Sequence, residues 1–225
     1  MHKTLIPIFD LDDTLYCEHD YVRSGFKSVA NFIASKNHTT DAELIYKSFI
    51  NVWLSHGRGK VFDIVCENLS IPFDIAKLVQ VYREHQPKLE LYDDAKEVLS
   101  YFNTKKIPMG LITDGNLTMQ WRKIKSLKLD KLIDVIIVTD DLGFEYWKPN
   151  AAPYKKAAQE LNVPIEKCVY IGDNPNKDFV TAKKLGMHTI RIVRPVGDHA
   201  KTRLNKTYEA DKEMYSLIEL LEKWS

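Results

Sequence analysis

Short apolar runs alternate with stretches of helical periodicity along the chain from about Leu91 onward. Nearly all-apolar runs of strand length cover residues 107–113, 133–139, 168–171 and 189–193, and a similar run covers 5–9. Stretches with apolar residues at helical spacing lie between them, at 95–102, 117–127, 153–161 and 179–185. Apolar strands separated by helices are typical of a parallel sheet covered on both faces. The pattern therefore predicts an α/β fold whose sheet starts near the N-terminus, is interrupted, and then resumes.

The C-terminal segment is predicted as a helix over about residues 211–224. Its apolar positions follow the i, i+3, i+4, i+7 spacing: Met214, Leu217, Ile218 and Leu221. This spacing places them on one face of a helix, which we expect to pack against the sheet.

The interruption of the sheet, residues 16–87, contains no convincing strand. Apolar residues at helical spacing indicate about four helices there, and one of them follows the capping-box pattern Thr40-Asp41-Ala42-Glu43. We interpret their apolar faces as the core of a small helical bundle. The predicted domains are therefore a core of residues 1–15 and 88–225 and an inserted helical unit of residues 16–87.

Composition and charge narrow the classes of function. The 225 residues are 44% hydrophobic and 28% charged, which suits a folded protein with a sizeable core. A net charge of +1 gives no general reason to expect nucleic acid or an anionic membrane as a partner. The three cysteines are far apart and form no metal-binding spacing, and the apolar run 5–9 is too short for a signal or membrane segment. We expect a cytoplasmic protein, monomeric or homodimeric, that acts on a small molecule.

An acidic cluster follows the first predicted strand. Asp10 and Asp12 lie two residues apart where that strand ends, so their carboxylates face one site and repel each other. Such a pair is costly unless a cation and an anionic substrate make use of it. The alternative is structural, because Asp12 or Asp13 could simply cap the next helix. Polar or charged residues at the ends of later strands would favour the interpretation of this cluster as part of a functional site.

Such residues follow the later strands. Ligands of open parallel sheets bind beyond the carboxyl ends of the strands. One strand ends in Thr113-Asp114-Gly115, a later loop carries Lys148, and another strand ends in Gly172-Asp173, with Asp178 close behind. Carboxylates, a hydroxyl and a lysine are thus expected at one edge of the sheet. Hard oxygen ligands with room left for water and phosphate suit Mg²⁺.

At this point the sequence resembles the haloacid dehalogenase-like superfamily. Its four motifs match, in order, Asp10-x-Asp12-x-Thr14, Thr113, Lys148 and Gly172-Asp173-x4-Asp178. The resemblance implies a Rossmann-like parallel sheet with helices on both faces, and residues 16–87 are similar to the helical C1 cap of subfamily I. It also implies a Mg²⁺-dependent phosphatase, a hydrolase that forms an aspartyl-phosphate.

The resemblance further implies roles for individual residues. Asp10 would be the nucleophile, and Asp12 would protonate the leaving group and later deprotonate water. Thr113 and Lys148 would complete the catalytic set, and together with Asp114 and Gly115 they would bind the substrate phosphate. The expected metal ligands are Asp10, the main-chain carbonyl of Asp12, and Asp173. Asp178 would support the metal from further out, through water.

Other functions stay open at the level of sequence. Nucleotides, sugar phosphates, phosphoglycolate and flavin mononucleotide are all candidate substrates of a subfamily I phosphatase. A phosphomutase would use the same aspartyl-phosphate, and a receiver-like signalling protein would also have acidic residues after the first strand. A non-catalytic phosphate-binding protein on this scaffold would be expected to have lost one of the four motifs, and none is lost. Asp12 argues against a dehalogenase, because a halide leaving group needs no such proton donor.

Overall fold

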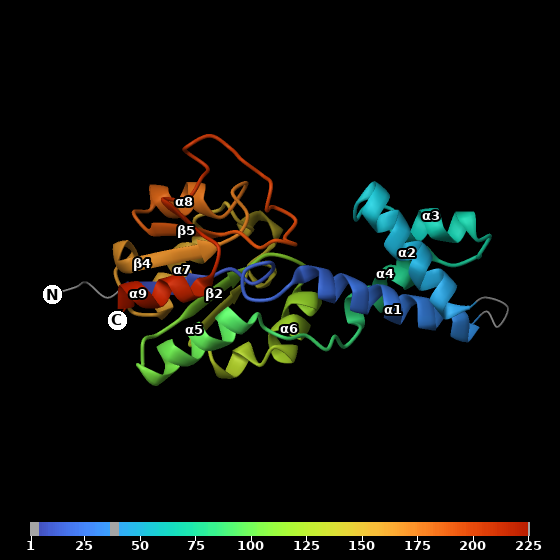
Figure 1. Cartoon of the computed structure of the whole chain (residues 1–225), viewed down its shortest axis with the longest axis horizontal. Helices are drawn as coiled ribbons and strands as arrows, with labels where there is room; N and C mark the ends of the chain where they lie inside the picture. Colours follow the sequence, from blue (N-terminus) through green and yellow to red (C-terminus); the bar gives the residue numbers. More distant parts are fainter. Residues whose placement is uncertain (1–4, 37–40, 225) are drawn as a thin grey trace. The chain divides into compact units, whose positions relative to one another are not determined.

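The computed structural model describes residues 5–36 and 41–224. The chain forms two compact units (Figure 1). One contains the residues up to Glu18 together with those from Leu89 onward, and the other spans His19–Lys88. Each unit has a fold of its own and is described separately below.

The larger unit is built on a six-stranded parallel sheet in the order β3-β2-β1-β4-β5-β6. Its strands are β1 (Ile6–Phe9), β2 (Gly110–Thr113), β3 (Val135–Val138), β4 (Cys168–Gly172), β5 (His188–Ile192) and β6 (Lys212–Met214). Phe9 at the end of β1 is in register with Leu111 of β2 and Ile171 of β4. The segments that follow these three strands therefore leave the sheet side by side, at the point where the strand order reverses and ligands of such sheets bind.

Helices cover both faces of this sheet, as predicted. They are α5 (Asp93–Thr104), α6 (Leu117–Ser126), α7 (Ala152–Glu160), α8 (Phe179–Lys184) and α9 (Leu221–Trp224). On one face, Ile8 belongs to a buried cluster with Tyr154 of α7 and Phe179 of α8. The next residue, Phe9, points to the opposite face, where its ring centroid lies 6.5 Å from that of Phe102 in α5. The α/β Rossmann-like fold predicted from the sequence is confirmed.

The predicted C-terminal helix over 211–224 is wrong in its first half. Residues Lys212–Met214 form the edge strand β6, which pairs in parallel with β5. Helical structure begins only after Ser216, which forms a capping box with Glu219 at the start of a 3₁₀ turn, Leu217–Leu220, that continues into α9. The helical spacing of Met214 relative to the later apolar residues was therefore coincidental. The capping box sets where the helix begins, and the residues before it pair with the edge of the sheet.

The smaller unit is helical and has its own core. It holds most of α1 (Glu18–Lys36) and all of α2 (Ala42–His56), α3 (Val61–Asn68) and α4 (Ile75–Glu84). Phe26, Phe49 and Phe62 pack with ring centroids 5.2–5.9 Å apart. Asp41 caps α2 through the N–H of Glu43, whereas Thr40 lies outside the described residues.

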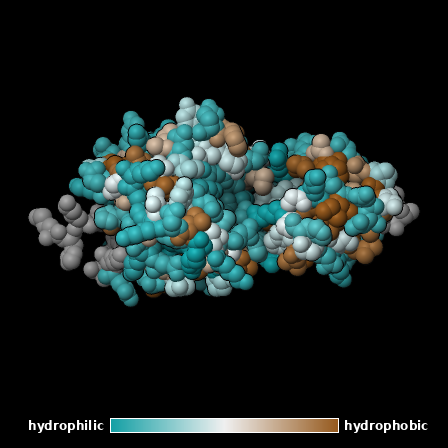
Figure 2. Space-filling view, turned by 90° about the horizontal axis from the view of Figure 1, so that it is seen from above, coloured by the Kyte–Doolittle hydropathy of each residue, from teal (hydrophilic) through white to brown (hydrophobic). Residues whose placement is uncertain are grey.

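The surface of this helical unit carries several hydrophobic groups. They are visible as brown patches over α1–α4 in Figure 2. Leu54, for example, is 73% exposed. Among the residues that the structure describes, no helix is both long and apolar enough to cross a lipid bilayer.

Candidate active site

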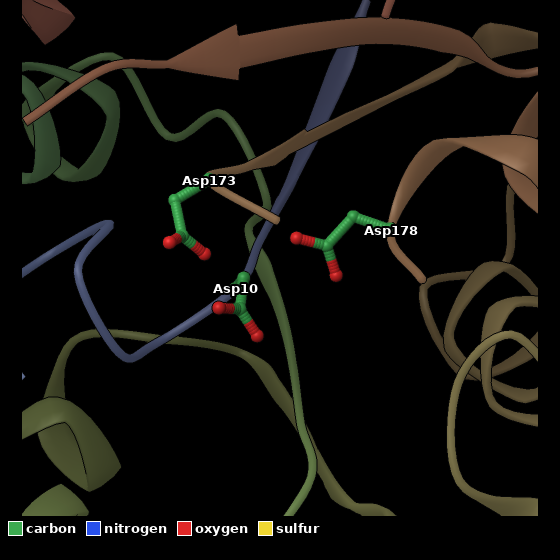
Figure 3. Close-up of side chains that lie close together, drawn as sticks. All are labelled: Asp10, Asp173 and Asp178. Atoms are coloured by element: carbon green, nitrogen blue, oxygen red, sulfur yellow. The ribbon is translucent and has the colours of Figure 1, made fainter. Parts of the chain in front are cut away.

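Three aspartates converge at the carboxyl edge of the sheet. Asp10 follows β1, Asp173 follows β4, and Asp178 directly precedes α8. Their carboxylates point toward one another, and oxygen atoms from all three lie within 4.8 Å of each other (Figure 3). All three side chains are buried. The strand order β2-β1-β4 produces this convergence, because it aligns the segments that carry Asp10 and Asp173.

Burial and mutual repulsion oppose ionisation of this acidic group. Burial, together with the charge of Asp178, raises the pKa of Asp10 to about 7 despite the opposing effect of Lys148. Burial also raises the pKa of Asp173 well above its usual value, and the charges of Asp178 and Asp10 add to the shift. Buried carboxylates of this kind are stabilised in their charged form by a cation.

Lys148 supplies one cation to this group. Its ammonium donates hydrogen bonds to Asp10 Oδ1 at 2.6 Å, to Asp178 Oδ1 at 2.8 Å and to the hydroxyl of Tyr170 at 2.8 Å. The lysine side chain is fully buried, and the two carboxylates raise its pKa well above the usual value although burial alone would lower it. Lys148 is therefore held as an ammonium whose three donor positions are all directed by the protein.

Asp114 anchors Lys148 and a second lysine. Its carboxylate accepts hydrogen bonds from the Lys148 main-chain N–H at 3.1 Å, from Thr139 Oγ1 at 2.8 Å and from Lys177 Nζ at 2.9 Å. Burial opposes ionisation of Asp114, but Lys148 and Lys177 lower its pKa below the usual value. The side chain of Asp114 thus positions two cations.

Asp12 faces away from the acidic group and toward α6. Its Oδ1 accepts hydrogen bonds from Lys123 Nζ at 2.7 Å and from the Tyr16 hydroxyl at 2.5 Å, and its Oδ2 accepts one from Gln120 Nε2 at 2.9 Å. Although burial by itself would raise the pKa of Asp12, the charge and hydrogen bond of Lys123, with those of Tyr16 and Gln120, lower it. The side chain of Asp12 therefore lies outside the cluster of three aspartates. This agrees with the expectation that Asp12 contributes only its main-chain carbonyl as a metal ligand.

Thr113 ends β2 and is linked to Asp12 through Gln120. The Gln120 Nε2 group donates to Thr113 Oγ1 as well as to Asp12. Because Thr113 accepts this bond, its own proton can be donated to another oxygen. The next loop turns at Gly115, whose φ of +134° favours glycine. A phosphate at the start of α6 would meet these loop amides first, because the N–H of Leu117 already donates to Asp140.

The acidic group fits a divalent cation. Three carboxylates and the single ammonium of Lys148 carry a formal charge of −2. Among the residues that the structure describes, none donates a hydrogen bond to the carboxylate of Asp173, although that residue is buried. Asp178 differs, because Lys148 occupies one of its oxygens and the N–H of Asn174 the other at 3.0 Å. Asp10 and Asp173 are thus available as direct ligands, and Asp178 is better placed to act through water.

Comparison with known proteins identifies the family of this constellation. The model of the family described as "Haloacid dehalogenase-like hydrolase" matches residues 7–192. The chain belongs to the haloacid dehalogenase-like hydrolase family. It is 26% identical over 228 residues to a glyceraldehyde 3-phosphate phosphatase of Pyrococcus furiosus, an alignment that covers 99% of this chain and 93% of the relative.

A second curated relative and a solved structure extend the comparison. A pyrophosphatase, PpaX, of Halalkalibacterium halodurans is 25% identical over 163 residues, covering 65% of this chain and 74% of the relative. The crystal structure of a HAD phosphatase from Thermococcus onnurineus superposes with a TM-score of 0.64 at 22% identity and covers 98% of both chains. The structural likeness extends over nearly the whole of each chain.

Several residues outside the motifs support the site and were not predicted from the sequence. They are Tyr16, Gln120, Lys123, Thr139, Tyr170 and Lys177. Their signal in the sequence is weak, because Gln120 and Lys123 lie among other polar residues of α6 in a stretch typical of a solvated helix face. The capping alternative holds for Asp13 only, whose Oδ1 accepts the N–H of Glu18 at the start of α1 at 2.9 Å.

Proposed function

We propose that this chain is a Mg²⁺-dependent phosphohydrolase that cleaves small phosphate monoesters through an aspartyl-phosphate on Asp10. The observation that carries the proposal is the contact of one buried ammonium, Lys148, with both Asp10 and Asp178 at 2.6 and 2.8 Å, beside Asp173. This arrangement joins a carboxylate nucleophile, a fixed cation and ligands for a divalent metal at one point.

Asp10 would act as the nucleophile. One of its oxygens, Oδ1, accepts the hydrogen bond of Lys148, which leaves Oδ2 to attack phosphorus. Attack forms the Oδ2–P bond and breaks the bond from phosphorus to the leaving oxygen. Because its pKa is raised to about 7 in the absence of a metal, Asp10 needs additional positive charge to be fully ionised at neutral pH. This requirement supports a metal ion as part of the working site.

The metal would be held by Asp10, Asp173 and the main-chain carbonyl of Asp12, with Asp178 as an outer partner. When bound, Mg²⁺ supplies charge stabilisation to the phosphoryl oxygens and to the ionised form of Asp10. Asp178 fixes Lys148 and accepts the N–H of Asn174, so it ties the cation and the loop after β4 together.

Asp12 would act as the general acid and the general base of the reaction. The lowered pKa of Asp12 favours its carboxylate, so in the first step its minor protonated form would give a proton to the leaving oxygen. In the second step the carboxylate would take a proton from the water that attacks the aspartyl-phosphate. The second step breaks the bond between phosphorus and Asp10 and releases phosphate. A pure mutase would instead return the phosphoryl group to a substrate hydroxyl.

Thr113 and the loop amides of Asp114 and Gly115 would donate hydrogen bonds to the phosphate oxygens, and Lys148 would neutralise the phosphate charge from its fixed position. The Thr113 proton is available for this contact because its Oγ1 accepts from Gln120. All of these parts are needed, since hydrolysis of phosphate monoesters can demand an acceleration of up to about 10²¹. General acid–base catalysis supplies only about 10²–10⁴ of that factor.

The substrate class is a small, soluble phosphate ester. The named activities of the relatives, on glyceraldehyde 3-phosphate and on pyrophosphate, place triose phosphate and pyrophosphate beside nucleotides, sugar phosphates, phosphoglycolate and flavin mononucleotide as compounds to test. The helical unit of residues 19–88 would serve as the cap that selects among them.

The test is phosphate release from this panel of compounds, with Mg²⁺ and with EDTA, by the wild type and by Asp10→Asn. The proposal expects release that needs the metal and is lost in Asp10→Asn. Asp93→Asn is the matched control, because Asp93 is an exposed aspartate at the start of α5 and should keep wild-type activity. Absence of release from every compound by folded wild-type protein would overturn the phosphohydrolase and favour a mutase or a binding role.

A further inference from the structure

We infer that Lys123 and Gln120 of α6 are positioning residues that fix the carboxylate of Asp12 beside Thr113. The inference rests on the proposed function, because it concerns how the proposed proton-transfer residue is held. Neither residue belongs to the four motifs, and both are almost completely buried.

Three hydrogen bonds hold the carboxylate of Asp12 and leave one acceptor position on Oδ2 open for proton transfer. Lys123 and Tyr16 donate to Oδ1, and Gln120 donates to Oδ2. A carboxylate with donors on both oxygens is confined to one rotamer, so its distance from a bound phosphate no longer depends on the mobility of the loop after β1. Orientation of this kind contributes to rate because proton transfer needs the acid or base within hydrogen-bond reach.

Gln120 adds a second constraint. Its amide group donates to both Asp12 and Thr113, so a single side chain sets the separation between the proton-transfer group and the phosphate-binding hydroxyl. The fit is tight on the other side as well. A β-carbon at position 115 would lie 3.1–3.3 Å from Gln120, and glycine is the residue found there.

A purely structural role for Lys123 is less consistent with its surroundings. Its ammonium is removed from water, with 2% of the side chain exposed, and it pairs with Asp12 at 2.7 Å and with Glu18 at 3.8 Å. Burying an ion pair costs desolvation energy, and a hydrophobic pair of similar volume often stabilises a fold at least as well. The position of the pair at the proposed proton-transfer residue suggests that it serves the reaction.

The test separates the two chemical steps with two substrates. The leaving group of p-nitrophenyl phosphate departs without a proton, whereas that of an alkyl phosphate such as glyceraldehyde 3-phosphate needs one. In Lys123→Met the first-turnover burst of nitrophenolate should persist at nearly the wild-type rate. Steady-state kcat for both substrates should fall about 10- to 100-fold, because Asp12 would act poorly as the base. For p-nitrophenyl phosphate KM should fall in parallel and kcat/KM should stay unchanged, because its first step is preserved.

Three variants complete the test. Lys123→Arg keeps a cationic donor and should recover much of the lost kcat, and Gln120→Leu should resemble Lys123→Met. Lys125→Met is the matched control, because Lys125 is an exposed lysine on the same helix. Thermal melts of all variants report whether they are folded.

The outcomes distinguish the inference from the proposed function. Metal-dependent release by the wild type with unchanged kcat in Lys123→Met, or an equal loss of the burst and of steady-state turnover, would overturn the positioning role alone. Wild-type protein that releases no phosphate from any substrate would refute the proposed function and this inference with it.

Discussion

Gly172 and Asp178 lie so close together that a β-carbon on residue 172 would overlap with the carboxylate of Asp178. That carboxylate is completely buried and binds both Lys148 and the N–H of Asn174. Glycine at the end of β4 is therefore required by the close approach of Asp178, a residue of the acidic site.

Gly172→Ala should consequently displace Asp178 and disturb the contact with Lys148. We expect a large loss of phosphatase activity and a destabilisation of about 1–3 kcal/mol, as for other overpacked sites. Urea denaturation and kcat measurement check both. Gly59→Ala is a suitable control, because a β-carbon there would meet no neighbouring atom within 4 Å. Wild-type activity in Gly172→Ala would contradict the proposed part of Asp178 in the site.

Lys148→Ala should lose most of the activity, because both the nucleophile and the phosphate would lose their fixed cation. It should also destabilise the metal-free protein, since removing one partner of a buried ion pair leaves an uncompensated charge, at a cost of about 3–5 kcal/mol. The activity assay and urea denaturation in EDTA measure the two effects. Lys156→Ala, at a half-exposed lysine of α7, is the control. A wild-type rate would mean that the third motif is misassigned.

Mg²⁺ should raise the melting temperature of the wild type, because a ligand that binds only the folded state stabilises it. Asp173→Asn should remove most of that rise, since Asp173 is the buried carboxylate without a donor among the described residues. Thermal melts over a series of Mg²⁺ concentrations test this without any substrate. An equal rise in both proteins would place the metal elsewhere.

The parts of the site that the sequence predicted are those whose position follows from strand order. Asp10, Thr113 and Asp173 come directly after strands, and parallel strands bring their carboxyl ends to one edge. Lys148 and Asp178 come within a few residues of the same edge. The structure brings all of them to the predicted edge, with Lys148 directly against Asp10 and Asp178.

The unpredicted parts depend on tertiary contacts that leave a weak trace in the sequence. Lys123 lies in a stretch with Arg122 and Lys125 that is typical of a solvated helix face. The burial of Lys123 follows only from the packing of α6 in the folded protein. The prediction of a helix at Met214 was wrong for a related reason, because pairing with the edge strand β5 outweighed the helical spacing of the apolar residues. Local patterns were therefore sufficient for the sheet and the motif residues but not for their supporting contacts.

The metal-free protein should become less stable as pH rises from about 4 to 7. Asp10 has a pKa of about 7 in the folded state against an ordinary value of 3.8, so between these values the folded state binds the proton more tightly than the unfolded state. The free energy of unfolding then falls with rising pH, by up to about 1.4 kcal/mol per pH unit for each such proton. The raised pKa of Asp173 acts in the same direction, whereas the lowered pKa of Asp12 acts only below its ordinary value of 3.8.

Urea denaturation in EDTA at pH 5 and pH 7 measures this dependence. Asp10→Asn removes the titrating group, so its stability should fall less between the two pH values than that of the wild type. Mg²⁺ favours the ionised form of Asp10 and should reduce the fall more in the wild type than in the variant, which keeps only Asp173 of the two direct ligands. The contrary outcome is that the stability of the metal-free wild type stays constant or increases from pH 5 to pH 7, in parallel with Asp10→Asn. It would show that the buried carboxylate of Asp10 is already ionised without a metal and that Lys148 alone suffices to stabilise its charge.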